Sequence, residues 1–538
     1  MSSCLAVGRP QTRRWTLIAC CLVALPFLTS AVSAATRGWM PTWDTAFTQL
    51  RVFDVGTRRT PLVGMPSTIS QSLAAPASHP GPLHFWLLAV PFVITRAWQS
   101  GLASAQAVVN AGVAVAAVLA VRSSIGARAM WVTVGVWMAA VVLIGDEVLH
   151  DPWNPHMTLV ALLGCAACAI AVVRGGPTWI TAALVVTTSI AAQAHLSGLP
   201  PALVLCCAAG VALVRRARWQ GSRCHLLAAG IALAVCWSGP VVDQIIHTPG
   251  NLRTLVSGAG SVEHPFGLLV GFDRLAGVLV PPGLVVHDVP SLPGGAGRWL
   301  LRLAAVALVV VVADVWRRRR GTVVGTVAGI TLLLAGATWL GQAITPRTYA
   351  SAFGGHIWAI MWPAAIGIWC VGMFAVGERI ATWTRRPLPQ ARVVPLVVPL
   401  VVPLIVLLSL AAVAVPVFAR VGHERDGAWF PLVRAAAAAV PSGRPRIDVV
   451  GDGIALESEL VAGVAAELER RGAVVRLSGD IAVGLVHPRR LQPATHTATL
   501  WISSSPTPPV SSAVRLIDLR SPTPGSPPEL HLYLEAEG

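Results

Sequence analysis

The sequence predicts a mainly α-helical membrane protein that crosses the bilayer many times and has a small α/β domain at its C-terminal end. Of its 538 residues, 54% are apolar and 12% are charged, and the mean hydropathy is +0.67, whereas soluble proteins carry about 25% charged residues. Apolar runs follow one another closely from about residue 15 to 418, and a polar tail follows them. These observations exclude an ordinary soluble protein and predict one membrane domain over 1–418.

Eleven apolar runs have about the length that a helix needs to cross a bilayer, which is roughly 20 residues. The first run follows basic residues and ends in SAVSAA, like a signal peptide, but it is longer than a typical signal-peptide core. We therefore expect an uncleaved first helix and about eleven transmembrane helices. The runs lie at 15–36, 102–121, 129–145, 157–173, 177–194, 199–214, 225–241, 299–316, 321–341, 356–376 and 393–418.

Arginine residues predict the orientation of these helices. All 40 basic residues are arginines, and most lie in short loops between apolar runs. If the N-terminus is in the cytoplasm, every loop assigned to the cytoplasm is basic, as the positive-inside rule requires. The same clustering argues against a nucleic-acid partner, despite the net charge of +16. We expect a multi-pass protein of the cytoplasmic membrane, with its N-terminus inside and its C-terminal domain outside.

The run from Leu83 to Thr95 is the exception in this pattern. It has only about 13 residues before Arg96, and counting it as a span would place Arg122 and Arg128 outside. We interpret it as a helix on the outer surface, although a count of twelve helices stays open. The outer segments are then 37–101, 146–156, 242–298 and 342–355.

The polar tail is predicted to form a linker over 419–445 and a small α/β domain over 446–538. IDVVGDG reads as a strand and a turn, ESELVAGVAAELERRG as an amphipathic helix that ends at Gly472, and AVVRL as a second strand. This order predicts one βαβ unit. The GDG is interpreted as a turn, because it is no dinucleotide-binding fingerprint.

The first outer segment opens with WDTAFTQLRVFDVGTRR. If residues 43–55 form a helix, Asp44, Arg51 and Asp54 lie on one face. A carboxylate just outside the first helix could accept a proton from a hydroxyl, and Arg51 and Arg58 could bind a phosphate. The alternative is a surface ion pair between Arg51 and Asp54, with the other arginines on lipid head groups. The residues alone favour neither.

The second outer segment, GDEVLHDPWNPH, concentrates polar groups in a chain that has few of them. Such a density favours a divalent-metal or acid/base site. The alternative is that the Asp-Pro and Asn-Pro pairs only cap the next helix. The polar residues are Asp146, Glu147, His150, Asp151, Asn154 and His156.

Two smaller polar clusters lie where helices meet the predicted outer surface. One contains Gln193 and His195, and the other contains Arg347, Tyr349 and His356. A single histidine in such a position is more often structural than a ligand. Neither cluster decides the function.

Together, these features resemble those of a known family. A first helix, an acidic residue just after it, an outer loop that closes on HPGPLHFWLLAVPF and an acidic loop after the third helix resemble the GT-C membrane glycosyltransferases. The relevant branch contains the protein O-mannosyltransferases and aminoarabinose transferases, and actinobacterial members are similar. The resemblance implies inverting transfer of a sugar from a polyprenyl-phosphate carrier to a hydroxyl of a cell-envelope glycan, lipid or protein, on the outer face.

The resemblance also implies roles for individual residues. Asp44 would be the general base, and the second acidic residue would be Asp146 or Asp151. His79 and His84, in HPGPLH, would line the site.

Two departures from the family pattern affect the carrier phosphate. The motif Lys-Pro-Pro or His-Pro-Pro is here His79-Pro80-Gly81-Pro82, and the chain has no lysine. Arg51, Arg58 or Arg347 would then bind the phosphate. We expect no required metal ion. The alternative is an Mg²⁺ or Mn²⁺ ion held by the carboxylates of the second outer segment.

Two other functions compete with this one. A transporter or flippase for a lipid-linked substrate would also have many helices, but transporters usually show two related halves and ionisable residues at mid-membrane depth. The sequence shows no such repeat, and Asp314, the one acidic residue within a predicted span, lies next to its cytoplasmic end. The other alternative is a non-catalytic protein of the same fold.

Overall fold

A computed structural model describes residues 10–67, 77–217, 223–259, 264–279, 294–347, 355–383, 407–408, 410–414, 427–441, 446–452, 457–478, 498–520 and 529–536. Within these ranges, nine helices are long and apolar enough to cross a membrane. The helix α8 (Thr178–Ala194) is equally apolar but has 17 residues. Ten of the eleven predicted spans are therefore helices, and the eleventh, 393–418, lies largely outside the described residues. The protein is a polytopic helical membrane protein.

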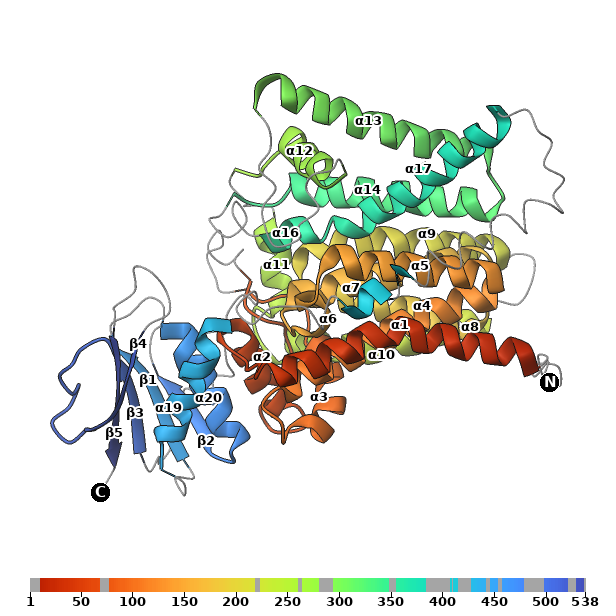
Figure 1. The fold of residues 1–538 in the computed structure, drawn as a ribbon. Coiled ribbons are helices and arrows are strands. Elements are labelled where there is room, and N and C mark those ends of the chain that lie inside the picture. Colours follow the sequence, from red (N-terminus) through yellow and green to blue (C-terminus); the bar gives the residue numbers. More distant parts are fainter. Residues whose placement is uncertain are drawn as a thin grey trace.

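The long helices run side by side, with the N-terminus at one end of the bundle and the C-terminal domain at the other (Figure 1). They are α1 (Pro10–Thr36), α4 (Gly101–Ser124), α5 (Ala127–Ile144), α7 (Asn154–Val173), α9 (Leu199–Ala217), α10 (Arg223–Ile246), α13 (Gly295–Arg318), α14 (Val323–Ala343) and α17 (Trp362–Trp383). Short helices connect them: α2 (Trp43–Asp54), α3 (Leu83–Thr95), α6 (Glu147–His150), η2 (Leu196–Gly198), α11 (Asn251–Ala259), α12 (Leu268–Leu279) and α16 (Gly355–Ala359).

Small side chains allow the central helices to approach closely. At Gly164 in α7, a Cβ atom would lie 2.5 Å from Val113 Cγ1 of α4. Alanines of α4, such as Ala107 and Ala114, are fully buried in the same core. Association of membrane helices depends on such packing, because lipid tails are as apolar as the side chains.

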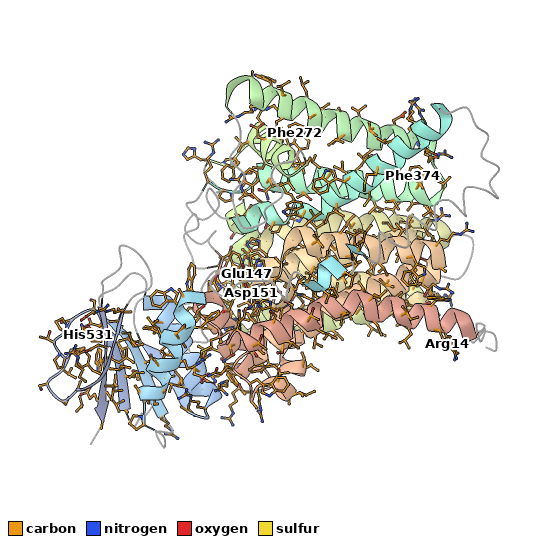
Figure 2. The ribbon with its side chains drawn as sticks, in the orientation of Figure 1. Arg14, Glu147, Asp151, Phe272, Phe374 and His531 are labelled. Atoms are coloured by element: carbon orange, nitrogen blue, oxygen red, sulfur yellow. The ribbon has the colours of Figure 1, made fainter. Side chains whose placement is uncertain are left out.

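The basic loops meet at the end of the bundle that is remote from the C-terminal domain. Arg174 Nη1 donates to Gly321 O at 2.8 Å, and Arg319 forms an ion pair with Glu378. In Figure 2, Arg14 lies at this end, whereas Glu147 and Asp151 lie at the end next to the C-terminal domain. The grouping agrees with the predicted alternation of basic and acidic loops. Which end faces the cytoplasm stays a prediction.

The helix α3 has 13 residues, fewer than the roughly 20 that a span needs. Val90, Val93 and Ile94 are exposed on its C-terminal half, while Phe85, Leu88 and Phe92 pack into the core that includes α2. These features agree with a helix that lies on the bundle and presents an apolar face to lipid.

The C-terminal domain contains a five-stranded sheet in the order β2-β1-β3-β5-β4. β1 (Arg446–Asp452) is parallel to β2 (Val474–Ser478) and β3 (Ala498–Ser503), and β5 (Glu529–Ala536) is antiparallel to β3 and β4 (Val514–Arg520). The helix α20 (Glu457–Arg470) connects β1 to β2, so the predicted βαβ unit is confirmed. Gly472, with a φ of +97°, ends the helix as predicted.

The segment predicted as a linker, 419–445, contains the helix α19 (Phe430–Ala439). Val433, Ala436 and Ala437 are fully buried in the core that α20 and the sheet share, and Arg471 Nη1 donates to Ala437 O at 2.8 Å. This part of the segment therefore packs as part of the C-terminal domain.

Candidate functional site

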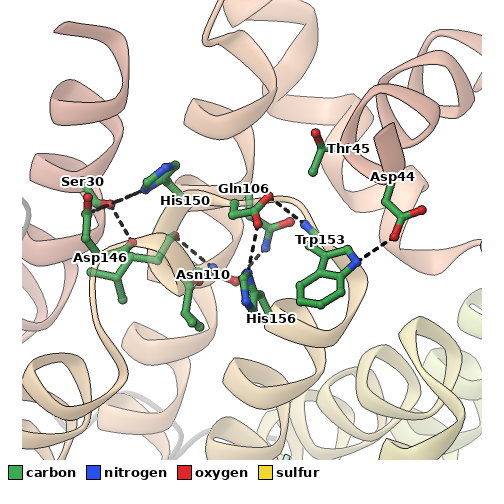
Figure 3. Close-up of polar contacts among 12 residues, drawn as sticks. Ser30, Asp44, Thr45, Gln106, Asn110, Asp146, His150, Trp153 and His156 are labelled. Carbon is green, nitrogen blue, oxygen red and sulfur yellow. Dashed lines mark hydrogen bonds and ion pairs between the residues drawn. The ribbon is translucent and has the colours of Figure 1, made fainter. Parts of the chain in front are cut away.

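Asp44 lies in the first turn of α2, which begins immediately after the loop that follows α1. Thr42 N donates to Thr45 Oγ1 at 2.9 Å, and Thr45 Oγ1 donates to Thr42 O at 2.7 Å, which fixes the start of the helix. Asp44 Oδ2 accepts a hydrogen bond of 2.9 Å from Trp153 Nε1 (Figure 3). The first and second outer segments therefore meet at this carboxylate.

Asp151 lies on the other side of Trp153. Its Oδ1 accepts a hydrogen bond from Trp153 N at 3.2 Å, and its Oδ2 lies 3.2 Å from His156 Nδ1. Trp153 therefore donates to both carboxylates, to Asp44 through its indole nitrogen and to Asp151 through its backbone nitrogen. Trp153 itself was not among the predicted residues, although its place between Asp-Pro and Asn-Pro put it within the polar segment.

His84 of α3 is connected to the second outer segment through side chains of α4. Its Nε2 donates to Gln106 Oε1 at 3.0 Å, and burial lowers its pKa to about 4, against the opposing effects of the Gln106 hydrogen bond and the Asp151 charge. Gln106 Nε2 donates in turn to Asn110 Oδ1 at 2.8 Å, and Asn110 Nδ2 donates to Leu149 O at 3.0 Å. A chain of amides therefore connects α3 through α4 to the second outer segment.

Asp146 lies in a separate network. It forms an ion pair of 2.5 Å with Arg37, and Ser30 Oγ donates to it at 2.5 Å. His150 Nδ1 lies 3.8 Å from Asp146 Oδ1 and 2.7 Å from Ser30 Oγ. Burial raises the pKa of Asp146, but His150, Ser30 and Arg37 outweigh it and lower the pKa to about 2. Arg37, which the sequence did not single out, neutralises the carboxylate that had been a candidate for the second acidic residue.

Arg51 and Asp54 are both buried, at 6% and 0% exposure, so the predicted alternative of a surface ion pair is wrong. Arg51 Nη2 donates to Val63 O at 2.9 Å, and its guanidinium lies 5.2 Å from the centre of the Phe85 ring. Asp54 forms an ion pair of 2.8 Å with Arg59. Both side chains hold the loop after α2, and Arg58 is exposed in that loop.

The HPGP segment is fixed against two other parts of the chain, the turn after α8 and the start of α11. His79 is buried, its Nδ1 accepts a hydrogen bond of 3.2 Å from Leu196 N, and its ring lies 4.6 Å from that of His195. Asn251 Nδ2 donates to Ser78 O at 3.1 Å and to His79 O at 3.3 Å. Burial lowers the pKa of His195 to about 4. The rings of His79, in the first outer segment, and His195, in the turn after α8, therefore pack against each other.

Close packing accounts for Gly81, at the position where the family that the sequence resembles has a second proline. A Cβ atom there would lie 2.1 Å from Gln193 Oε1 and 2.8 Å from Pro240 Cγ. Gln193 Oε1 accepts from Leu83 N at 3.3 Å, at the start of α3, and Gln193 Nε2 donates to Cys236 O at 2.7 Å. Only glycine fits between these side chains.

Three further predicted residues are Asn154, Glu147 and Arg347. Asn154 Nδ2 donates to Ala194 O at 2.8 Å, as a structural contact, and Glu147 is half-buried at the start of α6. Arg347 Nη2 donates to Phe266 O at 3.3 Å, so it belongs to the segments around α12 and α14. Tyr349 and the His356 side chain lie outside the described residues.

Arg274 of α12 is a buried cation. The sequence did not single it out, because an arginine in an amphipathic helix is usually on the polar face. It is 4% exposed, lies 3.7 Å from the centre of the Phe266 ring, and donates to Gln342 Oε1 at 3.2 Å.

Among the described residues, no group of three or more His, Cys, Asp or Glu side chains could hold a metal ion.

Comparison with known proteins gives the fold. No family model matches the sequence, and no curated protein matches it. Among solved structures, ArnT from Cupriavidus metallidurans in the apo state is similar over 97% of this chain and 98% of its own, with a TM-score of 0.54 and 13% sequence identity. At this identity the likeness concerns the fold alone. The chain therefore has an ArnT-like fold over 97% of its length, which agrees with the GT-C-like membrane fold that the resemblance of the sequence implied.

Proposed function

We propose that the protein is a membrane glycosyltransferase that moves a sugar from a polyprenyl-phosphate carrier to an acceptor hydroxyl. The observation that carries this proposal is the contact of Asp44 with Trp153, next to Asp151, within an ArnT-like fold. Two carboxylates and two imidazoles at the end of a membrane bundle suit proton removal from a hydroxyl beside the bilayer. ArnT belongs to the aminoarabinose transferases, one branch that the sequence resembles.

The proposed reaction is a single displacement. The acceptor oxygen attacks the anomeric carbon, Asp44 takes the hydroxyl proton, and the bond from that carbon to the phosphate oxygen breaks with its electron pair leaving on the phosphate. The configuration at the anomeric carbon is thereby inverted. Trp153 Nε1 orients the base, and Asp151, which lies against His156, orients the acceptor or the sugar.

The leaving phosphate needs a cation, and this chain offers only arginines. Arg58 is exposed in the loop after α2, whereas Arg51 and Arg347 donate to backbone carbonyls. We therefore propose Arg58 as the first contact of the carrier head group, and buried Arg274 as a further candidate cation. The proposed reaction uses no metal ion; loss of transfer in EDTA and its return with Mg²⁺ or Mn²⁺ would contradict this.

The test is transfer of radiolabelled sugar from a polyprenyl-phosphate donor in membranes that contain the Asp44→Asn variant. We expect transfer to fall by about 10²- to 10⁴-fold, which is the usual contribution of a general base. Asp314→Asn is the matched control, because Asp314 pairs with Arg317 and Arg318 at the remote end of α13. Undiminished transfer by well-expressed Asp44→Asn protein would reject the assignment of the base.

The two competing functions predict different results for the wild-type protein. A flippase would move the lipid-linked sugar across vesicles without consuming it, and a non-catalytic protein would do neither. Two measurements distinguish both from a transferase: the amount of glycosylated product formed, and the side of the vesicle membrane on which the lipid-linked donor is found.

A further inference from the structure

The C-terminal domain docks directly on the helix that carries Asp44. Gln49 Nε2 of α2 donates to Ala466 O of α20 at 3.2 Å, across 417 residues of sequence. Arg470 Nη1, in the last turn of α20, donates to Ala97 O just after α3 at 2.9 Å. Figure 1 shows α20 between the sheet and α2. The domain is thus attached to both short helices of the first outer segment.

Gly463 of α20 packs tightly against the chain that leads into α2. A Cβ atom there would lie 3.1 Å from Pro41 O and 2.7 Å from Val433 Cγ2. Pro41 precedes Asp44 by three residues. Any larger side chain at 463 would therefore displace either α19 or the backbone that leads into Asp44.

That backbone is strained between the two residues. Trp43 has a φ of +37°, a region that costs a residue other than glycine roughly 1–2 kcal/mol and persists only where the surroundings enforce it. On this side, Gly463 of α20 packs against the backbone at Pro41, two residues before Trp43. The strain precedes Asp44 by one residue, so relaxation at Trp43 would rotate the carboxylate.

The end of α20 is built to be rigid. Glu467 is 1% exposed and forms ion pairs with Arg470 at 2.7 Å and with Arg471 at 2.9 Å. Arg471 also donates to Ala437 O of α19. Arg470 therefore connects a buried carboxylate of the C-terminal domain to the membrane part of the chain.

We propose that the C-terminal domain is a positioning element for Asp44. Through Gly463 and Ala466, α20 holds the chain on both sides of Asp44, at Pro41 and at Gln49, so that the carboxylate faces Trp153. The effect on catalysis rests on the proposed function, but the effect on the backbone of α2 does not.

The test compares Gly463→Val with Gly112→Val in the full-length protein, purified in nanodiscs. Gly112 lies in α4, and nothing lies within 4 Å of an added Cβ atom there. We expect hydrogen exchange of the amides of 43–54 to rise about tenfold in Gly463→Val and not in Gly112→Val. For transfer, we expect kcat to fall by roughly 10- to 100-fold, with KM for the donor changed less than about twofold.

A second pair of variants acts at the other end of α20. Arg470→Ala removes the bond to Ala97 O, and Arg515→Ala is its control, because each arginine pairs with a carboxylate three residues away but Arg515 lies in β4. We expect the same rise in exchange over 43–54 for Arg470→Ala only.

The outcomes separate the two proposals. Unchanged exchange over 43–54 in both Gly463→Val and Arg470→Ala would overturn the positioning role, whatever the enzyme does. Increased exchange in Gly463→Val and Arg470→Ala, together with no transfer by the wild-type protein, would support the positioning role and reject the proposed function. A KM change with unaltered kcat would assign the domain to substrate binding instead, and would also overturn the inference.

Discussion

The indole nitrogen of Trp153 donates a hydrogen bond of 2.9 Å to the Asp44 carboxylate, although the two residues are 109 positions apart in the sequence. The backbone nitrogen of the same tryptophan donates to Asp151. One residue thus connects both carboxylates that we assign to the site. The donor is neutral, and because an indole N–H can only donate, Trp153 cannot take the proton that Asp44 would accept from the hydroxyl.

Replacing Trp153 by phenylalanine tests this connection. The ring is kept and the donor is lost, and a hydrogen bond to a charged group contributes about 1.5–3 kcal/mol. We expect transfer to fall by roughly tenfold or more, because the Asp44 carboxylate loses a stabilising donor. Trp237→Phe is the control, since Trp237 Nε1 donates to Ser189 in the membrane. Equal transfer rates for the two variants would contradict the role of Trp153.

Asp151 and Asp146 should respond differently to the same substitution. Asp151→Asn should reduce transfer at least tenfold with little change in Tm, because Asp151 lies beside Trp153 and His156. Asp146→Asn should instead lower Tm, since breaking a buried pair costs about 3–5 kcal/mol and Arg37 would be left without its carboxylate partner. Transfer and thermal unfolding should be measured on both variants. Loss of transfer in Asp146→Asn and loss of stability in Asp151→Asn would make Asp146 the second acidic residue.

The buried histidines predict acid sensitivity. Burial lowers the pKa of His195 to about 4 from an unfolded value near 6.5. Between these values the unfolded chain binds more protons than the folded chain, so stability falls as the pH drops from about 6.5 to 4 and then levels off. His84 adds to the same window. Thermal unfolding of His195→Asn should depend less on pH in this window than thermal unfolding of the wild-type protein, and an equal dependence would contradict the contribution of His195.

Gly81→Ala should destabilise the protein through one defined contact. The added Cβ atom would lie 2.1 Å from Gln193 Oε1, and overpacking of this kind costs about 1–3 kcal/mol. Gly112→Ala, in open space, should have little effect on Tm. The double variant Gly81→Ala with Gln193→Ala should recover part of the loss, and a strictly additive loss would show that the contact with Gln193 is not the cause.

Local patterns were sufficient for much of the fold. Apolar runs predicted ten helices of the membrane part that the structure describes, and turn residues such as Gly472 predicted the end of α20. They failed at α19, which lies within the segment 419–445 that was predicted to be a linker but packs in one core with α20 and the sheet. The helix count was predictable because the bilayer imposes a length on each segment separately.

The sequence by itself determined which residues could act: a carboxylate after the first helix, a polar second segment, and arginines as the only basic residues. Tertiary structure alone decided which of them meet. Trp153 brings Asp44 to Asp151, Arg37 draws Asp146 into a separate ion pair, and α20 contacts α2 through Gln49. These choices depend on contacts between residues more than 100 positions apart, which no local periodicity records, because hydrogen bonds and ion pairs form by distance in space and not in sequence.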